Sequence, residues 1–243
     1  MTRFLLALIA PLTLSAQLST QLTPATEQAF EDYRKTTEAQ LTWRPRFTSA
    51  GKGGKLEISP SGKQGTFEVK GGLIHDWTGA IFANGATVDQ VLKVFQDYDN
   101  YKKVYPPEVV DSKLLSHEGN QWRLYLKLVK KKALTAVLNS EYDVEYRPLG
   151  EGRWAMISRS TKMVEVENGK ELPAGSGHGF LWRLNAYWLI EPRPGGVYLE
   201  CRTISLSRNI PTGLGWIIRP MVSSLPRESL TATLEATVRA VKP

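Results

Sequence analysis

The sequence has little of the chemistry that marks disulfide-stabilised proteins and metalloproteins. It contains one cysteine, Cys201, which excludes an internal disulfide, and three histidines, His75, His117 and His178. No histidine has another histidine or a cysteine at metal-ligand spacing, so we predict no metal site and no cofactor. Cys201 lies in an apolar, strand-like segment and is expected to be a small buried side chain.

Long hydrophobic runs are also scarce, and the one at the N-terminus is too short to span a bilayer. Residues 4–14 are apolar apart from Pro11 and Thr13, with Arg3 before them and small residues at positions 15 and 16. A positive start, an apolar stretch and a small-residue cleavage site are typical of a secretory signal peptide. We therefore interpret residues 1–16 as a signal peptide, with an uncleaved anchor as the alternative. The protein is expected to be exported, to the periplasm or to the medium.

Charge is unbalanced, with 31 Lys and Arg against 24 Asp and Glu, a net charge of +7. A basic surface favours anionic partners, but export argues against nucleic acid. The run Lys130, Lys131 and Lys132 lies between two predicted strands. It is either a solvated hairpin turn or a transient contact with anionic headgroups at a membrane surface.

The order of predicted elements indicates an α+β fold with an N-terminal extension over residues 17–71. Thr23 and Pro24 begin a helix that would run to about Leu41. Residues 66–69 and 72–82 then read as strands. Thr87 and Gln90 form a capping box for a helix with an apolar face, followed by a shorter helical piece that Pro106 and Pro107 end.

Six strand-like segments follow, at about 108–117, 120–130, 133–147, 152–166, 180–191 and 196–208. Alternation is clean in two of them, which predicts an antiparallel sheet with one wet face. We expect the basic row of the second strand to pair with the acidic row of the third. The apolar faces carry Trp122, Leu124, Leu126 and Leu128, and Tyr142, Val144 and Tyr146.

The C-terminal part is expected to be helical from residue 212 to residue 241. Leu230, Leu234, Val238 and Val241 recur at helical spacing, so the helix should rest one face on apolar neighbours. Pro220 and Pro226 should break or kink it.

This order of elements resembles the START-related helix-grip superfamily, which includes polyketide cyclases and coenzyme Q-binding proteins. Residues 86–101, with Asp97, Tyr98 and Tyr101, followed by residues 106–112, are similar to its opening helix–helix–strand segment. The resemblance covers about 72–241 and implies a START-like domain at 72–243. It also implies a curved antiparallel sheet around the C-terminal helix, with a cavity for a lipid, sterol, quinone or polyketide.

We therefore expect non-catalytic binding or carriage of a hydrophobic small molecule by a monomer. One alternative is an enzyme of the cyclase, hydrolase or isomerase type in the same cavity, with His75, Glu200 and Arg202 as the first candidates. Another is a domain whose own side chains fill the cavity and which acts through its surface. The helices around 87–105 and the loop 172–179 would gate entry.

Inward-facing aromatic and apolar side chains of a curled sheet are expected to line the pocket, with core packing as the alternative for each. Arg183, Asn185 and Tyr187 share one face of their strand. Pointing inward, they would orient a polar group of the ligand; pointing outward, they would be ordinary surface. The predicted ligand-binding residues are Trp77, Phe95, Tyr105, Trp122, Leu124, Tyr142, Tyr146, Trp154, Arg183, Asn185, Tyr187, Trp216, Leu230 and Leu234.

Overall fold

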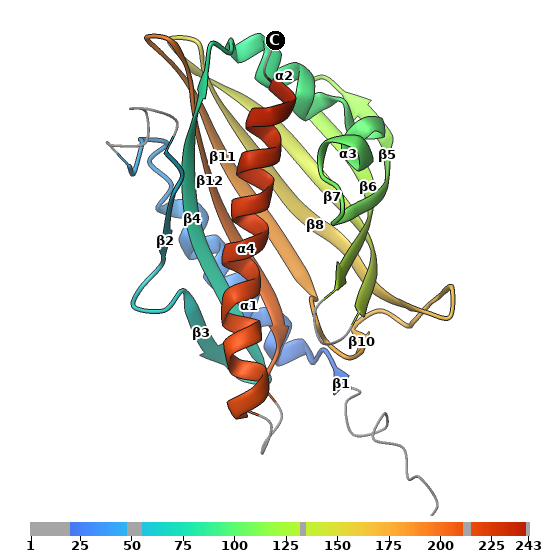
Figure 1. The fold of residues 1–243 in the computed structure, drawn as a ribbon. Helices are drawn as coiled ribbons and strands as arrows, with labels where there is room; N and C mark the ends of the chain where they lie inside the picture. The colour runs from blue at the N-terminus through green and yellow to red at the C-terminus, as the bar shows by residue number, and fades with distance from the viewer. Residues whose placement is uncertain (1–19, 48–54, 132–134, 211–214, 242–243) are drawn as a thin grey trace, which may run out of the picture.

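The computed structural model describes residues 20–47, 55–131, 135–210 and 215–241, with side chains in the last range from Ser224 onward. The fold is α+β, as predicted. A large antiparallel sheet curves around one long helix, α4 (Gly215–Val241), and shorter helices cover one end (Figure 1). Residues 1–16, predicted to be a signal peptide, lie outside the described residues.

The sheet has ten strands in the described part of the chain, and all its pairings are antiparallel. Each of the six strand-like segments predicted after residue 107 is present as a strand, with bounds shifted by a few residues. The order across the sheet is β2 (Glu57–Pro60), β4 (Gly72–Asn84), β12 (Gly196–Arg208), β11 (Arg183–Arg193), β8 (Arg153–Glu167), β7 (Thr135–Gly150), β6 (Gln121–Lys131) and β5 (Val109–Glu118), with β3 (Thr66–Val69) on β4 and β9 (Lys170–Glu171) on β8.

Cross-strand charge pairing between β6 and β7 is confirmed on the outer face of the sheet. Arg123 lies opposite Asp143, and its guanidinium is 3.0 Å from Glu141 and 3.8 Å from Asp143. The alternate residues of the same strands, among them Leu124 and Tyr142, are buried on the inner face. Because one face of these strands meets water and the other meets the core, their period-2 pattern was readable in the sequence.

The helices at one end of the sheet begin as their capping residues predict. In α2 (Val88–Gln96), the Gln90 N–H donates to Thr87 Oγ1 at 3.3 Å, and the Thr87 N–H donates to Gln90 Oε1 at 2.8 Å. The short helices η1 (Tyr98–Asn100) and α3 (Tyr101–Val104) follow, and the chain leaves them through Pro106 and Pro107.

Helix α4 runs unbroken through Pro220 and Pro226, so the expected break at these prolines does not occur. Each proline removes only one backbone donor, so a helix can continue through it where packing compensates for the loss. Leu234 is fully buried against β4 where Gly79 leaves room. A Cβ at Gly79 would come within 2.7 Å of Leu234 Cδ1. Among the described residues, no helix combines the length and hydrophobicity needed to cross a bilayer.

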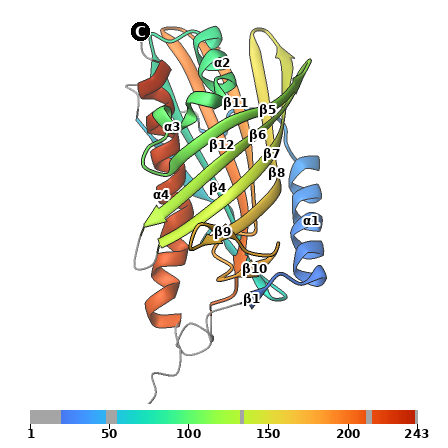
Figure 2. The ribbon, with the colours of Figure 1, turned by 90° about the vertical axis from the view of Figure 1, so that its right-hand side faces the viewer.

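The N-terminal segment packs on the opposite face of the sheet from α4 (Figure 2). Helix α1 (Pro24–Ala39) begins at Thr23, whose Oγ1 accepts the Thr26 N–H at 3.2 Å, and ends two residues before the predicted Leu41. Its Phe30 belongs to a second apolar core with residues such as Ile204 and Leu206. The chain before α1 forms β1 (Thr20–Gln21), which pairs with β10 (Ser176–Gly177).

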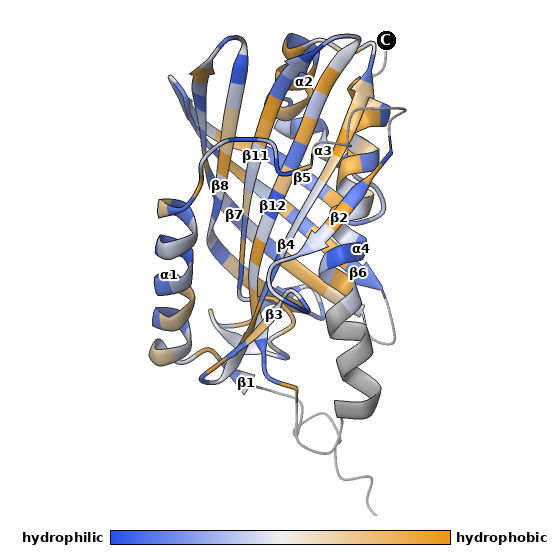
Figure 3. Ribbon diagram, turned by 90° about the vertical axis from the view of Figure 1, so that its left-hand side faces the viewer, coloured by the Kyte–Doolittle hydropathy of each residue, from blue (hydrophilic) through white to orange (hydrophobic). Residues whose placement is uncertain are grey.

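Polar contacts fix α1 to the sheet as well. The Tyr33 hydroxyl donates to Asp76 Oδ2 at 2.7 Å, and Arg202 Nε donates to Asp76 Oδ1 at 2.9 Å. Arg159 reaches Glu38 at 2.8 Å. Hydrophobic and hydrophilic residues alternate along several strands (Figure 3). The central strands of the sheet contribute side chains to an apolar core on each face.

Candidate functional site

A cavity of about 610 Å³ lies between the inner face of the sheet and α4. This volume is within the range of small-molecule sites. Its wall on β6 and β7 is almost wholly apolar, and α4 contributes small and apolar side chains. These walls comprise Leu124, Leu126, Leu128, Leu138, Tyr142 and Val144 from the sheet, and Leu225, Leu230, Ala232 and Ala236 from the helix.

The end of the cavity under α2 and α3 is aromatic. The Phe95 ring meets the Trp188 ring edge to face, with centroids 4.8 Å apart. The Phe95 carbonyl accepts hydrogen bonds from the Tyr101 hydroxyl at 2.7 Å and the Tyr146 hydroxyl at 2.9 Å. Burial raises the pKa of Tyr105 to about 12, so the phenol is neutral at any physiological pH. The hydrogen bonds to the Phe95 carbonyl join α2 to α3 and to strand β7.

The opposite end of the cavity, near Ser224 and the residues that follow it in α4, contains polar groups. His75 is 3% exposed; its Nε2 lies 3.0 Å from Ser207 Oγ and its Nδ1 lies 3.3 Å from Thr66 Oγ1. Burial lowers the pKa of His75 to about 4, so the ring is neutral at pH 7.

A polar link joins α4 to the sheet edge at this end. Lys130 Nζ donates to Glu108 Oε1 and, at 3.0 Å, to Ser229 Oγ. All three residues line the cavity. Of the predicted lysine turn, Lys130 is therefore engaged in the wall, Lys131 is exposed, and Lys132 lies outside the described residues.

A histidine–carboxylate cluster lies beside the polar end. His178 Nδ1 is 3.2 Å from Glu165 and 3.3 Å from Glu167, and the three possible ligand atoms lie within 4.8 Å of one another. Glu165 already accepts backbone N–H groups of His178 at 2.8 Å and Phe180 at 3.0 Å. Its observed role is to hold residues 178–180 against the cavity. No sequence spacing pointed to this group, because the strand and the loop meet only in the fold.

Five of the fourteen predicted ligand-binding residues line the cavity. Another five belong to the surrounding apolar cluster or pack against it, without lining the cavity. The lining residues are Phe95, Tyr105, Leu124, Tyr142 and Leu230. The five others are Trp77, Trp122, Tyr146, Trp154 and Leu234. Trp216 lies among the residues whose side chains are not described.

The remaining three, Arg183, Asn185 and Tyr187, point to the outer face, which corrects their expected place in the pocket. The Tyr187 hydroxyl donates to Glu38 at 2.9 Å, Arg183 pairs with Glu27, and Asn185 Oδ1 accepts the Ser160 N–H at 3.1 Å. Helix α1 covers this face and supplies two of these partners, so the polar side is turned toward it. The alternate residues of β11, namely Leu184, Ala186 and Trp188, line the cavity instead.

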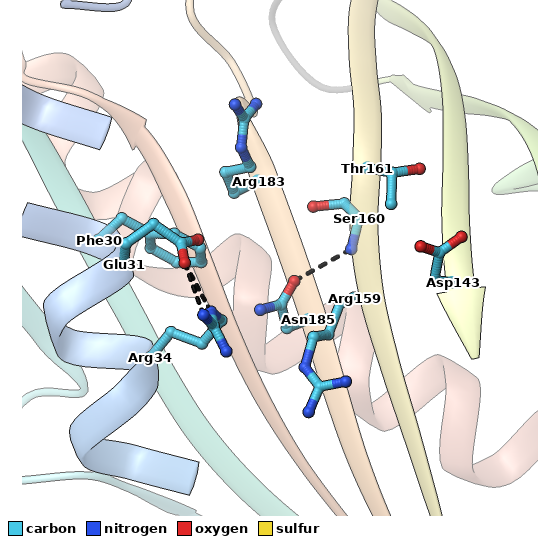
Figure 4. Close-up of a pocket in the computed structure, with 9 residues that line it drawn as sticks. All are labelled: Phe30, Glu31, Arg34, Asp143, Arg159, Ser160, Thr161, Arg183 and Asn185. Atoms are coloured by element: carbon cyan, nitrogen blue, oxygen red, sulfur yellow. Dashed lines mark hydrogen bonds and ion pairs between the residues drawn. The ribbon is translucent and has the colours of Figure 1, made fainter. Parts of the chain in front are cut away.

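A second, outer pocket of about 400 Å³ lies between α1 and the sheet (Figure 4). Its arginines are already neutralised: Arg34 lies 2.7 Å from Glu31, Arg159 lies 2.8 Å from Glu38, and Arg183 pairs with Glu27. The inner cavity is larger and mostly apolar, so it is the stronger candidate site.

Of the three residues considered for catalysis, only His75 faces the cavity. Glu200 lies on the outer side, where it accepts the Arg46 N–H at 2.7 Å, and Arg202 is paired with Asp76. Cys201 lines the cavity and is buried, as predicted, and burial raises the pKa of its thiol well above the usual value. Cavity-wall residues outside the predicted set include Met156, Ser158, Trp188, Thr203, Ser205 and Ser207.

No family model matches the sequence, and no curated protein matches it. Solved structures do match. The STAR-related lipid transfer protein from Xanthomonas axonopodis is 18% identical, with a TM-score of 0.50, over 71% of this chain and 98% of that one. Human STARD10 is 14% identical, with a TM-score of 0.50, over 91% and 82%. The Zhui aromatase/cyclase from Streptomyces is 13% identical, with a TM-score of 0.48, over 69% and 93%. The chain has the START-related helix-grip fold, as the sequence resemblance implied.

Proposed function

We propose that this protein binds and carries a hydrophobic small molecule, without catalysis, in the cavity between the sheet and α4. The observation that carries the proposal is the cavity itself, about 610 Å³ and walled on most sides by apolar side chains. A domain that acted only through its surface would gain stability by filling such a space. The fold is shared with a solved lipid transfer protein, which supports the same class of ligand.

Native mass spectrometry of the full chain, purified from its host, tests the proposal directly. We expect a protein population carrying extra mass that organic extraction removes, and the extracted compound should be hydrophobic. Carriage would be refuted if the protein from the host showed only the mass of the polypeptide and also failed to bind the neutral apolar dye N-phenyl-1-naphthylamine.

A cavity-filling variant tests where the ligand sits. Ala186 lines the cavity from β11. The larger side chain of Ala186→Phe should therefore extend into the cavity and occupy the space of the ligand. We expect dye affinity to fall at least tenfold with little change in Tm. Ala25→Phe, on the exposed side of α1, is the matched control and should bind as wild type does. Equal binding by both variants would place the ligand elsewhere.

One observation favours a second candidate, a hydrolase-type activity in the same cavity. The 3.0 Å contact between His75 Nε2 and Ser207 Oγ has the form of a base–nucleophile pair. The partner of Nδ1 is the Thr66 hydroxyl rather than a carboxylate, and a pKa of about 4 makes His75 a weak base. Covalent labelling by a fluorophosphonate that Ser207→Ala abolishes would establish the activity; no labelling favours simple carriage.

Export, monomeric state and transient membrane contact remain proposals from the sequence. Determining the N-terminus of the protein from its host tests cleavage after Ala16. Light scattering on the purified protein tests the monomer. Co-sedimentation with vesicles containing phosphatidylserine, compared with neutral vesicles, tests membrane contact.

A further inference from the structure

Part of strand β12 places polar side chains toward the apolar cavity and apolar side chains toward the outer face of the sheet. Along residues 203–207, the side chains of Thr203, Ser205 and Ser207 face the cavity. The alternate residues, Ile204 and Leu206, face outward and are fully buried in the second core under α1. Packing alone would favour the reverse arrangement or apolar side chains on both faces. The cavity side of this strand is therefore a hydroxyl stripe, made of Thr203, Ser205 and Ser207.

The hydroxyl stripe is only partly satisfied by the protein. Ser207 has His75 as a partner at 3.0 Å. Ser205 is 7% exposed, lies directly opposite His75 in the register, and has no hydrogen-bond partner among the described residues. Thr203 likewise has none in the part of the chain that the structure describes. Ser205 is buried and Thr203 is half-buried. Hydroxyls withdrawn from bulk water are ordinarily hydrogen-bonded, so these two groups are suited to bonding something inside the cavity.

The stripe also gives the cavity a direction. The facing wall on β6 and β7 carries Leu124, Leu126 and Tyr142, and the far end is closed by Phe95 and Trp188. A ligand with one polar group gains most by placing that group on the stripe and its apolar body toward the aromatic end.

Of the titratable groups around the stripe, one is neutral and two are cations that already donate hydrogen bonds to other protein groups. His75 is uncharged at pH 7. Lys130 is held by Glu108 and Ser229. Arg208 Nε donates to the Asn209 carbonyl at 3.2 Å, and its Nη1 donates to the His178 carbonyl at 3.3 Å. Because the donors of Lys130 and Arg208 are engaged elsewhere, the stripe itself offers only neutral hydroxyls, which suit a hydroxyl or carbonyl better than a buried carboxylate.

We propose that the hydroxyl stripe on β12 is a subsite for the neutral hydroxyl or carbonyl group of an otherwise apolar ligand. The ligand class is then an alcohol or ketone with a hydrocarbon body rather than a fatty acid. This inference rests on the proposed function and adds the chemistry and orientation of what is bound.

The test compares ligands that differ only in their polar group. Displacement of N-phenyl-1-naphthylamine from the full chain is measured with 1-decanol, 2-decanone, decanoate and decane. Wild type should bind the alcohol and the ketone about tenfold more tightly than decane, the gain of one or two net hydrogen bonds. In the double variant Thr203→Val, Ser205→Ala, this preference should shrink to about twofold or less, with decane affinity unchanged or higher.

Thr161→Val is the control, since Thr161 is exposed on β8 and lies outside the cavity wall. It should keep the wild-type preference, and circular dichroism should show all variants folded. Equal affinity for decanol and decane in wild type, or tightest binding of decanoate, would overturn the subsite. Failure of folded wild type to bind any probe, decane and dye included, would overturn the proposed function itself.

Discussion

His75 should make the stability of the protein fall at acidic pH. In the folded chain its pKa is lowered by burial from 6.5 to about 4. As pH drops below 6.5, the unfolded chain takes up a proton at this site and the folded chain does not, so unfolding becomes more favourable. The contribution of His75 is complete above pH 6.5 and is lost progressively between pH 6.5 and 4.

The size of this effect follows from the pKa difference. A separation of 2.5 pH units corresponds to about 3.5 kcal/mol at roughly 1.4 kcal/mol per unit, of which about 2.5 kcal/mol is lost by pH 4.5. The side chain is 3% exposed, so solvent screening reduces this little. Against a total stability of about 5–15 kcal/mol, the loss is easily measured.

Urea unfolding of wild type and His75→Gln at pH 7.5, 6.5, 5.5 and 4.5 isolates the contribution, since carboxylates titrate in both proteins. The free energy of unfolding of wild type should fall toward acid by about 2.5 kcal/mol more than that of the variant. His117→Gln, at an exposed histidine, is the matched substitution control. Parallel curves for wild type and His75→Gln would refute a buried neutral imidazole.

Three further perturbations test other contacts. Asp76→Asn removes the buried partner of Arg202 and should cost about 3–5 kcal/mol in urea unfolding, because it leaves a charge without its counterion; a loss under 1 kcal/mol would contradict that. Leu234→Ala should cost about 2–5 kcal/mol in the same measurement, since the side chain fills the space above Gly79. Cys201 should react with Ellman's reagent only after urea is added, given its burial and raised pKa; rapid reaction of the native protein would show that the cavity admits the reagent.

Local signals in the sequence predicted local structure well. The capping box at Thr87 and Gln90 fixes the start of α2 by contacts within four residues, so no tertiary information was required. The alternation around Leu124 and Tyr142 was readable because one face of β6 and β7 meets water. The fold followed from the order of such elements.

The residues of the site were harder to predict from the sequence, and strand β11 shows why. Tyr187 and Trp188 are both buried, one under α1 and the other in the cavity wall. A period of two identifies two faces but does not say which one turns inward when both are covered. Arg183 and Asn185 were misplaced for this reason. Contacts such as His178 with Glu165 depend on a loop folding back on a strand, which sequence spacing does not reveal.

The covering of the outer face bears on how the protein can be handled in the laboratory. A version starting at Gly72, where the resemblance to START-related proteins begins, would leave Ile74, Ile204 and Leu206 without Phe30 above them. These side chains would form an exposed hydrophobic patch in the middle of the sheet, and such patches promote aggregation. A chain trimmed to start at Gly72 is therefore expected to aggregate, and ligand uptake should be measured on protein that keeps helix α1.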